Sequence, residues 1–202
     1  MDRAAECFRR ALELKPDYAD ALDSLGVLLQ DQGRLDEAIA CYRRAVELKP
    51  DYADACYNLG NALADQGKLE EAIACYRRAL ELQPDFAAAY CELGTALRDQ
   101  RKLDEAVACL RRAAELQPSY VQAHNNLGNA LGDEGKLDEA VACYRRALAL
   151  RPDSAEIHNN LGLALGKQGK LDEAVACYRR AVALKPDYTQ ARNALDRALR
   201  GR

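Results

Sequence analysis

The chain has 202 residues, of which 49% are hydrophobic and 30% charged, and its formal net charge is −3. This balance is ordinary for a folded globular protein, and it excludes the disordered and collagen-like classes. No apolar run approaches the roughly 20 residues of a membrane span, so no membrane partner is expected. The chain has no basic surplus overall, so no nucleic-acid partner is expected either.

Eight cysteines and the absence of an apolar leader bear on the compartment. Six of the cysteines recur every 34 residues, so they occupy one equivalent position on stacked elements, at 7, 41, 75, 109, 143 and 177. Neighbouring helices lie roughly 8–10 Å apart, and a disulfide needs Cα atoms within about 7 Å. The sequence therefore predicts free thiols and a reducing compartment, most simply the cytoplasm.

The six prolines are also spaced by 34, at 16, 50, 84, 118, 152 and 186. A fixed period of this length is typical of a solenoid of helical hairpins. Within the repeat 53–86, numbered from position 1 at Ala53, apolar residues fit two successive helix faces. Gly67 separates the two predicted helices, and Pro84 prevents the second from continuing.

Each repeat is predicted to be a pair of helices, which we call the first-type and the second-type helix in chain order. The predicted elements are a lone second-type helix in residues 1–18, five helix pairs, and a lone first-type helix in residues 189–202. The pairs occupy residues 19–52, 53–86, 87–120, 121–154 and 155–188. We expect one array that spans residues 1–202. Arg101 replaces the separating glycine of the third pair, so we expect that pair to be the weakest.

Small and large residues alternate at fixed positions of the repeat. Position 8 is glycine in the five full repeats, position 24 is mostly tyrosine, and positions 20 and 27 are alanine. A glycine inside a helix costs about 1 kcal/mol, so its recurrence predicts a neighbouring helix too close for a Cβ atom. Paired arginines at positions 25 and 26, such as Arg43 and Arg44, are predicted to pair with acidic neighbours; phosphate binding is the minority interpretation.

The pattern of Leu-Gly at positions 7 and 8, Ala at 20, an aromatic at 24, Ala at 27 and Pro at 32 resembles the tetratricopeptide repeat. The resemblance covers essentially the whole chain. It implies an all-α, right-handed superhelical solenoid whose first-type helices line a concave groove. It also implies a non-catalytic scaffold that binds a peptide or protein segment without a cofactor.

The resemblance places groove residues at positions 5, 6, 9 and 13, and many of these are amides. The predicted peptide-binding residues are Tyr57, Asn58, Asn61, Asn125, Asn126, Asn129, Asn159, Asn160 and Asn193, with Asp31 and Asp65 at position 13. An asparagine offers a donor and an acceptor and can pair with a peptide backbone. The alternative is that these amides bond neighbouring helices or face water.

Charge and end effects leave further alternatives open. Residues 1–101 carry 13 basic and 19 acidic side chains, so the N-terminal groove would favour a basic segment, or else is simply a solvated acidic face. Asparagines at positions 6 and 9 also resemble the repeats of O-linked N-acetylglucosamine transferases, which implies a recognition domain without its catalytic part. A third possibility is a self-stacking module joined through 1–18 and 189–202. There Asp196 replaces the position-8 glycine, which favours monomers or weak head-to-tail association.

Overall fold

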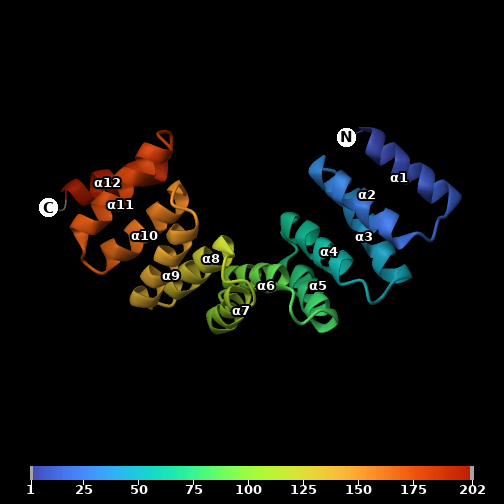
Figure 1. Ribbon diagram of the computed structural model, residues 1–202, viewed down its shortest axis with the longest axis horizontal. Coiled ribbons are helices and arrows are strands. Elements are labelled where there is room, and N and C mark those ends of the chain that lie inside the picture. The colour runs from blue at the N-terminus through green and yellow to red at the C-terminus, as the bar shows by residue number, and fades with distance from the viewer. Residues whose placement is uncertain (1, 201–202) are drawn as a thin grey trace. The chain divides into compact units, whose positions relative to one another are not determined.

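The structure is a computed structural model that describes residues 2–200, with side chains described from residue 6 onward. The described residues form twelve α-helices and no strand (Figure 1). Their bounds are α1 Asp2–Leu14, α2 Ala19–Asp31, α3 Leu35–Leu48, α4 Ala53–Asp65, α5 Leu69–Leu82, α6 Ala87–Asp99, α7 Leu103–Leu116, α8 Val121–Asp133, α9 Leu137–Leu150, α10 Ala155–Lys167, α11 Leu171–Leu184 and α12 Thr189–Arg200. The all-α prediction is confirmed. No helix in this described part is long and apolar enough to cross a membrane.

Each helix boundary follows from local chemistry. Two residues after the first helix of a pair ends, the chain turns at a residue in the left-handed region, with φ of 74° at Gly33, 75° at Gly67 and 62° at Arg101. The second helix opens with acidic residues, such as Glu70 and Glu71 of α5, which favour its positive end. A proline two residues after the helix then excludes a further turn.

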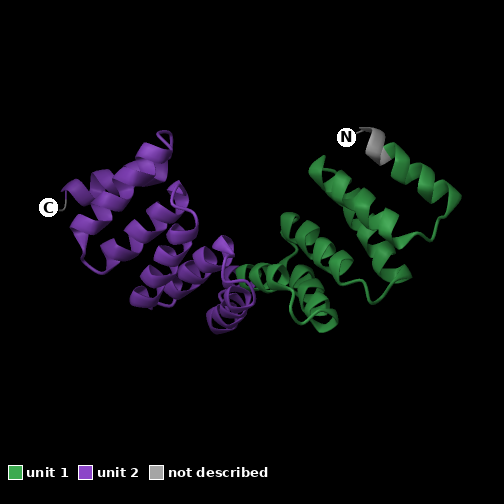
Figure 2. Ribbon diagram, viewed as in Figure 1, with its two compact units in different colours: residues 1–96 green, residues 97–202 purple. Residues whose placement is uncertain are grey.

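The helices group into two compact units, residues 1–96 and 97–202, with the division inside α6 (Figure 2). Within each unit, successive helices pack against one another, as α4 does against α5 and α8 against α9. The core consists of alanines at positions 20 and 27 together with leucines of the first-type helices, and Ala72, Ala79 and Leu63 are almost completely buried.

Glycine and tyrosine meet inside four of the helix pairs. A Cβ atom built on Gly26, Gly60, Gly128 or Gly162 would lie 2.6 Å from Cε1 of the tyrosine at position 24 of the same repeat. Real Cβ atoms are not found so close to another heavy atom. The prediction that these glycines admit a close neighbour is confirmed.

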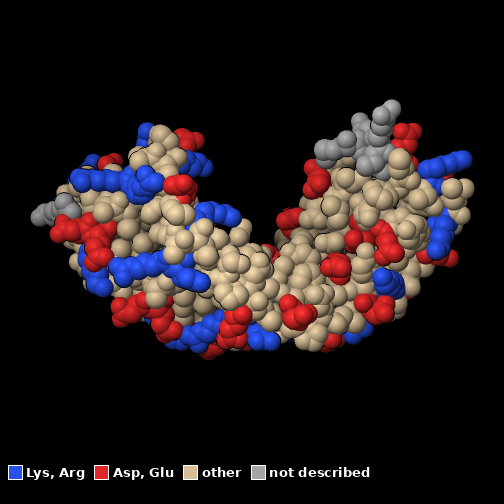
Figure 3. All heavy atoms as spheres, viewed as in Figure 1, with Lys and Arg blue, Asp and Glu red and all other residues tan. Residues whose placement is uncertain are grey.

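The arginines of the second-type helices form ion pairs across the outer face. Arg43 pairs with Glu71 at 3.0 Å, and Arg145 pairs with Glu173 at 3.1 Å. Figure 3 shows basic and acidic side chains interspersed over this face of each unit. The predicted pairing is confirmed. Exposed pairs of this kind contribute at most about 1 kcal/mol each, so they mainly solvate the surface.

All eight cysteines are free, as predicted. The position-23 thiols from Cys41 to Cys177 are half-buried, whereas Cys7 is exposed. Cys91, at position 5 of the third full repeat, is completely buried, so its thiol is not exposed in a groove.

The N-terminal helix carries a partly uncovered apolar face. Phe8 and Ala11 of α1 line a cavity of about 270 Å³ together with Tyr18 and residues of α2. A second copy's α12 docked there in repeat register would place Asp196 against Phe8, where the internal repeats have room only for glycine. Head-to-tail association stays a prediction, and the placement of Asp196 against Phe8 in such a pair disfavours it.

Candidate functional site

The predicted amides lie on first-type helices at positions 5, 6 and 9. Positions 5, 6 and 9 share one helix face, because residues three and four apart are neighbours on a helix surface. The structure separates them into two groups by burial. Position 5 lies against the neighbouring repeat, and positions 6 and 9 lie nearer to solvent.

Three polar side chains at position 5 are buried where the following repeat covers them. Asp23, Asn125 and Asn159 are only 8%, 7% and 3% exposed. The expectation that Asn125 lines an open groove therefore needs correction, because its side chain belongs to the packing between repeats. Asn159 is also buried, but it lines a cavity of about 260 Å³ together with Asn193, so its place in a groove stays a prediction. The Oδ1 atom of Asn159 is buried and has no hydrogen-bond partner among the described residues.

In residues 1–96, the amides bond within the protein. Nδ2 of Asn58 donates to Oδ1 of Asp23 at 3.0 Å. Burial raises the pKa of the Asp23 carboxyl, and the bond from Asn58 partly opposes this rise. The hydroxyl of Tyr76 donates to Oδ1 of Asn61 at 2.9 Å. Asn58 thus bonds across repeats and Asn61 bonds the other helix of its own repeat, which is the bonding to neighbouring helices that the sequence left open as an alternative.

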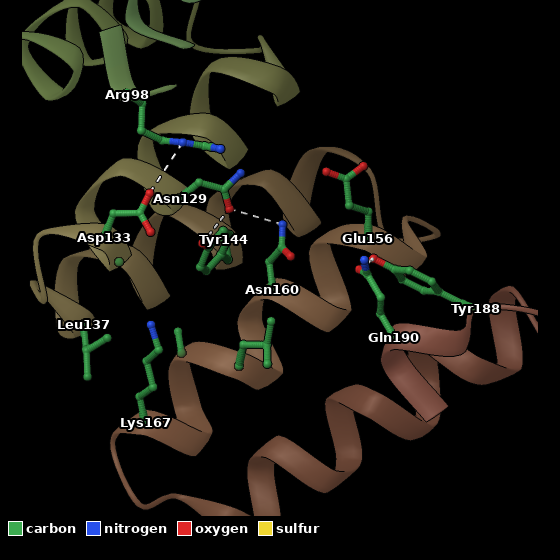
Figure 4. Close-up of a pocket in the computed structure, with 13 residues that line it drawn as sticks. Arg98, Asn129, Asp133, Leu137, Tyr144, Glu156, Asn160, Lys167, Tyr188 and Gln190 are labelled. Carbon is green, nitrogen blue, oxygen red and sulfur yellow. Dashed lines mark hydrogen bonds and ion pairs between the residues drawn. The ribbon is translucent and has the colours of Figure 1, made fainter. Parts of the chain in front are cut away.

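In residues 97–202, the amide network leaves two groups free. Nδ2 of Asn160 donates to Oδ1 of Asn125 at 3.2 Å. Oδ1 of Asn129 accepts from Nδ2 of Asn160 at 3.2 Å and from the hydroxyl of Tyr144 at 2.8 Å (Figure 4). Within the described structure, Nδ2 of Asn129 and Oδ1 of Asn160 have no hydrogen-bond partner. One free donor and one free acceptor therefore lie on neighbouring helices.

These two amides line a cavity of about 490 Å³ built entirely from residues of the second unit (Figure 4). Its walls come from α6, α8, α9, α10 and the start of α12, and its other polar residues are Arg98, Asp133, Tyr144, Glu156, Lys167, Tyr188 and Gln190. Nε of Arg98 lies 3.5 Å from the Asp133 carboxylate. The cavity thus combines amides, both signs of charge and tyrosine hydroxyls.

Residues 19–202 match a family model for tetratricopeptide repeats that is described as the C-terminal domain of cilia and flagella-associated protein 70. The chain belongs to the tetratricopeptide repeat family. Among curated proteins none matches it.

Several solved tetratricopeptide repeat structures are similar over most of this chain. YrrB, described as having an unusual peptide-binding site, is 28% identical with a TM-score of 0.77, and the match covers 95% of this chain and 99% of YrrB. TTC0263 from Thermus thermophilus is 28% identical with a TM-score of 0.69, covering 90% and 98%. MamA is 26% identical with a TM-score of 0.74, covering 80% and 95%. Proteins of this family are typically non-catalytic scaffolds for protein interactions.

The other predicted residues of this tetratricopeptide repeat protein have mixed surroundings. Tyr57 is half-buried, and its ring centroid lies 4.9 Å from that of Phe86, so it packs rather than projects. Asp31 and Asp65 are exposed, and Asp65 accepts a bond from Gln30 at 2.8 Å. Asn126 is half-buried, whereas Asn193 is exposed and lines a separate cavity of about 260 Å³ beside α10.

Gly132 lines the cavity, although the repeat pattern alone did not mark it as a site residue. A Cβ atom on Gly132 would meet only the Tyr144 hydroxyl, at 3.9 Å, so internal packing does not require glycine there. In the repeat 19–52, the side chain of Gln30 occupies this position and bonds the Tyr42 hydroxyl at 3.1 Å. The sequence does contain a signal that could have identified Gly132. Position 12 is Gln30, Ala64 and Arg98 in the first three full repeats and becomes glycine in the fourth.

One half-buried carboxylate distinguishes the first unit. Glu92 occupies position 6, where three other repeats have asparagine, and the described structure gives it no hydrogen bond or ion pair. Burial, and then the nearby Asp65 carboxylate, raise the pKa of Glu92. This part of the protein therefore carries uncompensated negative charge.

Proposed function

We propose that this protein is an interaction scaffold that binds an extended segment of a partner protein in the cavity over Asn129 and Asn160. The observation that carries the proposal is the pair of free amide groups on α8 and α10. A peptide carbonyl can accept from Nδ2 of Asn129, and a peptide N–H can donate to Oδ1 of Asn160. Contacts of this kind hold a backbone without specifying its side chains.

Three observations support this proposal. Both amides are already oriented by bonds to Asn125 and Tyr144, so little side-chain entropy is lost on binding. Gly132 leaves open the space that Gln30 fills in an earlier repeat. YrrB, which is similar over nearly the whole chain, is described as having a peptide-binding site.

The test compares two matched double variants of the full chain. Asn129→Ala/Asn160→Ala removes the free amides, and Asn58→Ala/Asn61→Ala removes asparagines at the same repeat positions of α4. Each variant takes the partner from one tyrosine hydroxyl, on Tyr144 or Tyr76, so the structural costs are comparable. The probe is a pool of random octapeptides, acetylated and amidated at their ends, captured on the immobilised protein.

We expect the wild type and the Asn58/Asn61 variant to retain the same peptides and the Asn129/Asn160 variant to lose them. Absence of any retained peptide on the wild type would contradict peptide binding. Equal retention by both variants would contradict this site. Circular dichroism of each variant confirms that the helices remain folded before capture.

For the first unit we propose a preference for basic segments, carried by the unpartnered Glu92 carboxylate and the neighbouring Asp65. A lysine or arginine side chain of the partner would compensate the negative charge of Glu92, which no cation pairs with in the described structure. The matched comparison is Glu92→Gln against Asp85→Asn, which removes an exposed carboxylate outside the groove positions. Binding of an acetylated octapeptide of alternating lysine and glycine should weaken only in Glu92→Gln; equal binding would contradict the preference.

The resemblance to a glycosyltransferase recognition domain stays a prediction. It rests on asparagines at positions 6 and 9. The structure shows that Asn58, Asn61, Asn129 and Asn160 also bond within the protein. The scaffold function does not depend on that resemblance.

A further inference from the structure

A further cavity of the second unit lies one repeat beyond the Asn129 cavity and shares Leu163 and Lys167 with it. It has a volume of about 360 Å³ and is lined by Leu163, Gly166 and Lys167 of α10, Tyr178 of α11, and Ala194, Arg197 and Ala198 of α12. The three residues of α10 occupy the repeat positions that Asn129, Gly132 and Asp133 occupy in α8. The same scaffold surface is therefore present twice, with different side chains.

The charge at the second cavity is reversed. Position 13 is aspartate in four successive repeats, at Asp31, Asp65, Asp99 and Asp133, and becomes Lys167 in the fifth. In the described structure Lys167 forms no ion pair. Arg197 forms only a bond from Nε to the backbone oxygen of Asn193, at 3.3 Å. Two cations thus line one cavity without a carboxylate partner.

The two acidic side chains that line the first cavity, Asp133 and Glu156, have other partners. Asp133, which lines the first cavity together with Lys167, is paired with Arg98. Glu156 accepts a bond from Nδ2 of Asn125 at 3.4 Å. Asp196 is exposed and has no ion pair in the part of the chain that the structure describes. Among the described residues, therefore, no carboxylate neutralises the two cations.

An apolar side chain lines the same cavity as the two cations. Leu163 is 43% exposed, although position 9 holds an amide at Asn61 and Asn129. Gly166 keeps the adjoining space open, because a Cβ atom there would meet Tyr178 Oη at 3.6 Å and Ala174 Cβ at 4.0 Å, which are ordinary contacts. Packing therefore does not require this glycine, and a side chain there would instead reduce the cavity.

We propose that the surface formed by Leu163, Gly166, Lys167, Ala194 and Arg197 binds an acidic side chain, aspartate or glutamate, of a peptide segment that carries an apolar residue beside it. The carboxylate would lie between the ammonium of Lys167 and the guanidinium of Arg197, where charge-assisted hydrogen bonds are stronger than neutral ones. The apolar neighbour would cover Leu163. This proposal rests on the proposed function and narrows it to acidic segments.

The experiment uses a positional-scanning library of octapeptides, acetylated and amidated so that no terminal carboxylate is present. Each pool fixes one residue type at one position, and its binding to the full chain is measured by fluorescence anisotropy. The test variant is Lys167→Asp/Arg197→Glu; the aspartate restores the residue that the other repeats have at position 13. The control variant, Arg146→Glu/Arg179→Glu, changes the net charge equally on exposed positions of α9 and α11.

We expect pools with fixed aspartate or glutamate to bind the wild type and the control variant at least tenfold more tightly than the matching asparagine or glutamine pools. In the variant Lys167→Asp/Arg197→Glu this preference for acidic pools should disappear. Adding Asn129→Ala/Asn160→Ala to that variant should still weaken the binding of the pools that it retains. Binding without an acidic preference, or a preference that the test variant retains, would overturn this inference and leave the proposed function standing. Absence of binding in every pool would overturn both.

Discussion

Gly60 of α4 lies directly against the Tyr76 ring of α5, so that a Cβ atom on Gly60 would stand 2.6 Å from Cε1. Gly60→Ala should therefore destabilise the protein, because the steric cost of overpacking, about 1–3 kcal/mol, exceeds the gain in helix propensity of about 1 kcal/mol. Urea unfolding followed by circular dichroism measures the change. In a Tyr76→Leu background the ring is absent, and the penalty should shrink; an equal penalty in both backgrounds would contradict the contact.

Gly132 differs from Gly60, because no neighbouring side chain lies close enough to require glycine at this position. Its Cβ atom would lie in open space apart from the Tyr144 hydroxyl at 3.9 Å. Gly132→Ala should leave the fold intact and increase the free energy of unfolding by up to about 1 kcal/mol. The same urea measurement tests this prediction, and a destabilised variant would show that packing, rather than the open cavity, requires glycine at this position.

The contrast between these glycines shows what sequence reasoning could reach. Position 8 recurs as glycine in every full repeat, so the period itself predicted a close contact. Gly132 and Gly166 occur only in the last two full repeats, and their significance depends on the space around them. That space is set by side chains of neighbouring repeats, which the spacing of residues along the chain does not specify.

The amides show the same limit more clearly. The sequence placed Asn125, Asn129 and Asn160 on one face, and the helices carry them at the expected repeat positions. It could not tell that Asn125 is buried while Asn129 keeps a free nitrogen, because this depends on how far each helix lies from the next repeat. The prediction of bonded amides is confirmed for Asn58, Asn61 and Asn160, whereas ligand binding by the amides stays a prediction.

Arg101 adopts the left-handed conformation that glycine provides in the other described turns, with φ of 62°. Its turn keeps the usual bonds, from Arg101 N to Arg98 O at 2.8 Å and from Lys102 N to Leu97 O at 2.9 Å. Arg101→Gly should therefore raise the free energy of unfolding by about 1 kcal/mol, because the Cβ penalty is removed without loss of a bond. Gly67→Arg is the reciprocal control and should lower it; changes of the same sign in both variants would contradict this account.

Glu92 should make stability depend on pH. Its folded pKa is raised, mainly by burial and then by Asp65, so the folded state holds its proton to higher pH than the unfolded state does. The stability associated with the protonated carboxyl is fully present below the unfolded pKa of about 4.5 and is lost as pH rises through the folded pKa. The free energy of unfolding of Glu92→Gln should therefore exceed that of the wild type at pH 7, where burial of a charged carboxylate is avoided, and differ little from it at pH 4. Urea titrations at both pH values, with Asp85→Asn as the control, test this; an equal gain at both would contradict it.

The free thiols should differ widely in reactivity, although they recur with one period. Cys7 is exposed, whereas Cys91 and Cys56 are buried. Burial, followed by the proximity of Cys56 and Glu71, raises the pKa of Cys75 to about 11. At pH 8 only roughly 0.1% of such a thiol is the reactive thiolate. Iodoacetamide labelling followed by mass spectrometry should therefore modify Cys7 first, Cys75 far more slowly, and Cys91 only after unfolding. The urea-unfolded chain, labelled at the same pH, should react at similar rates throughout, and native Cys75 reacting as fast as Cys7 would contradict its burial.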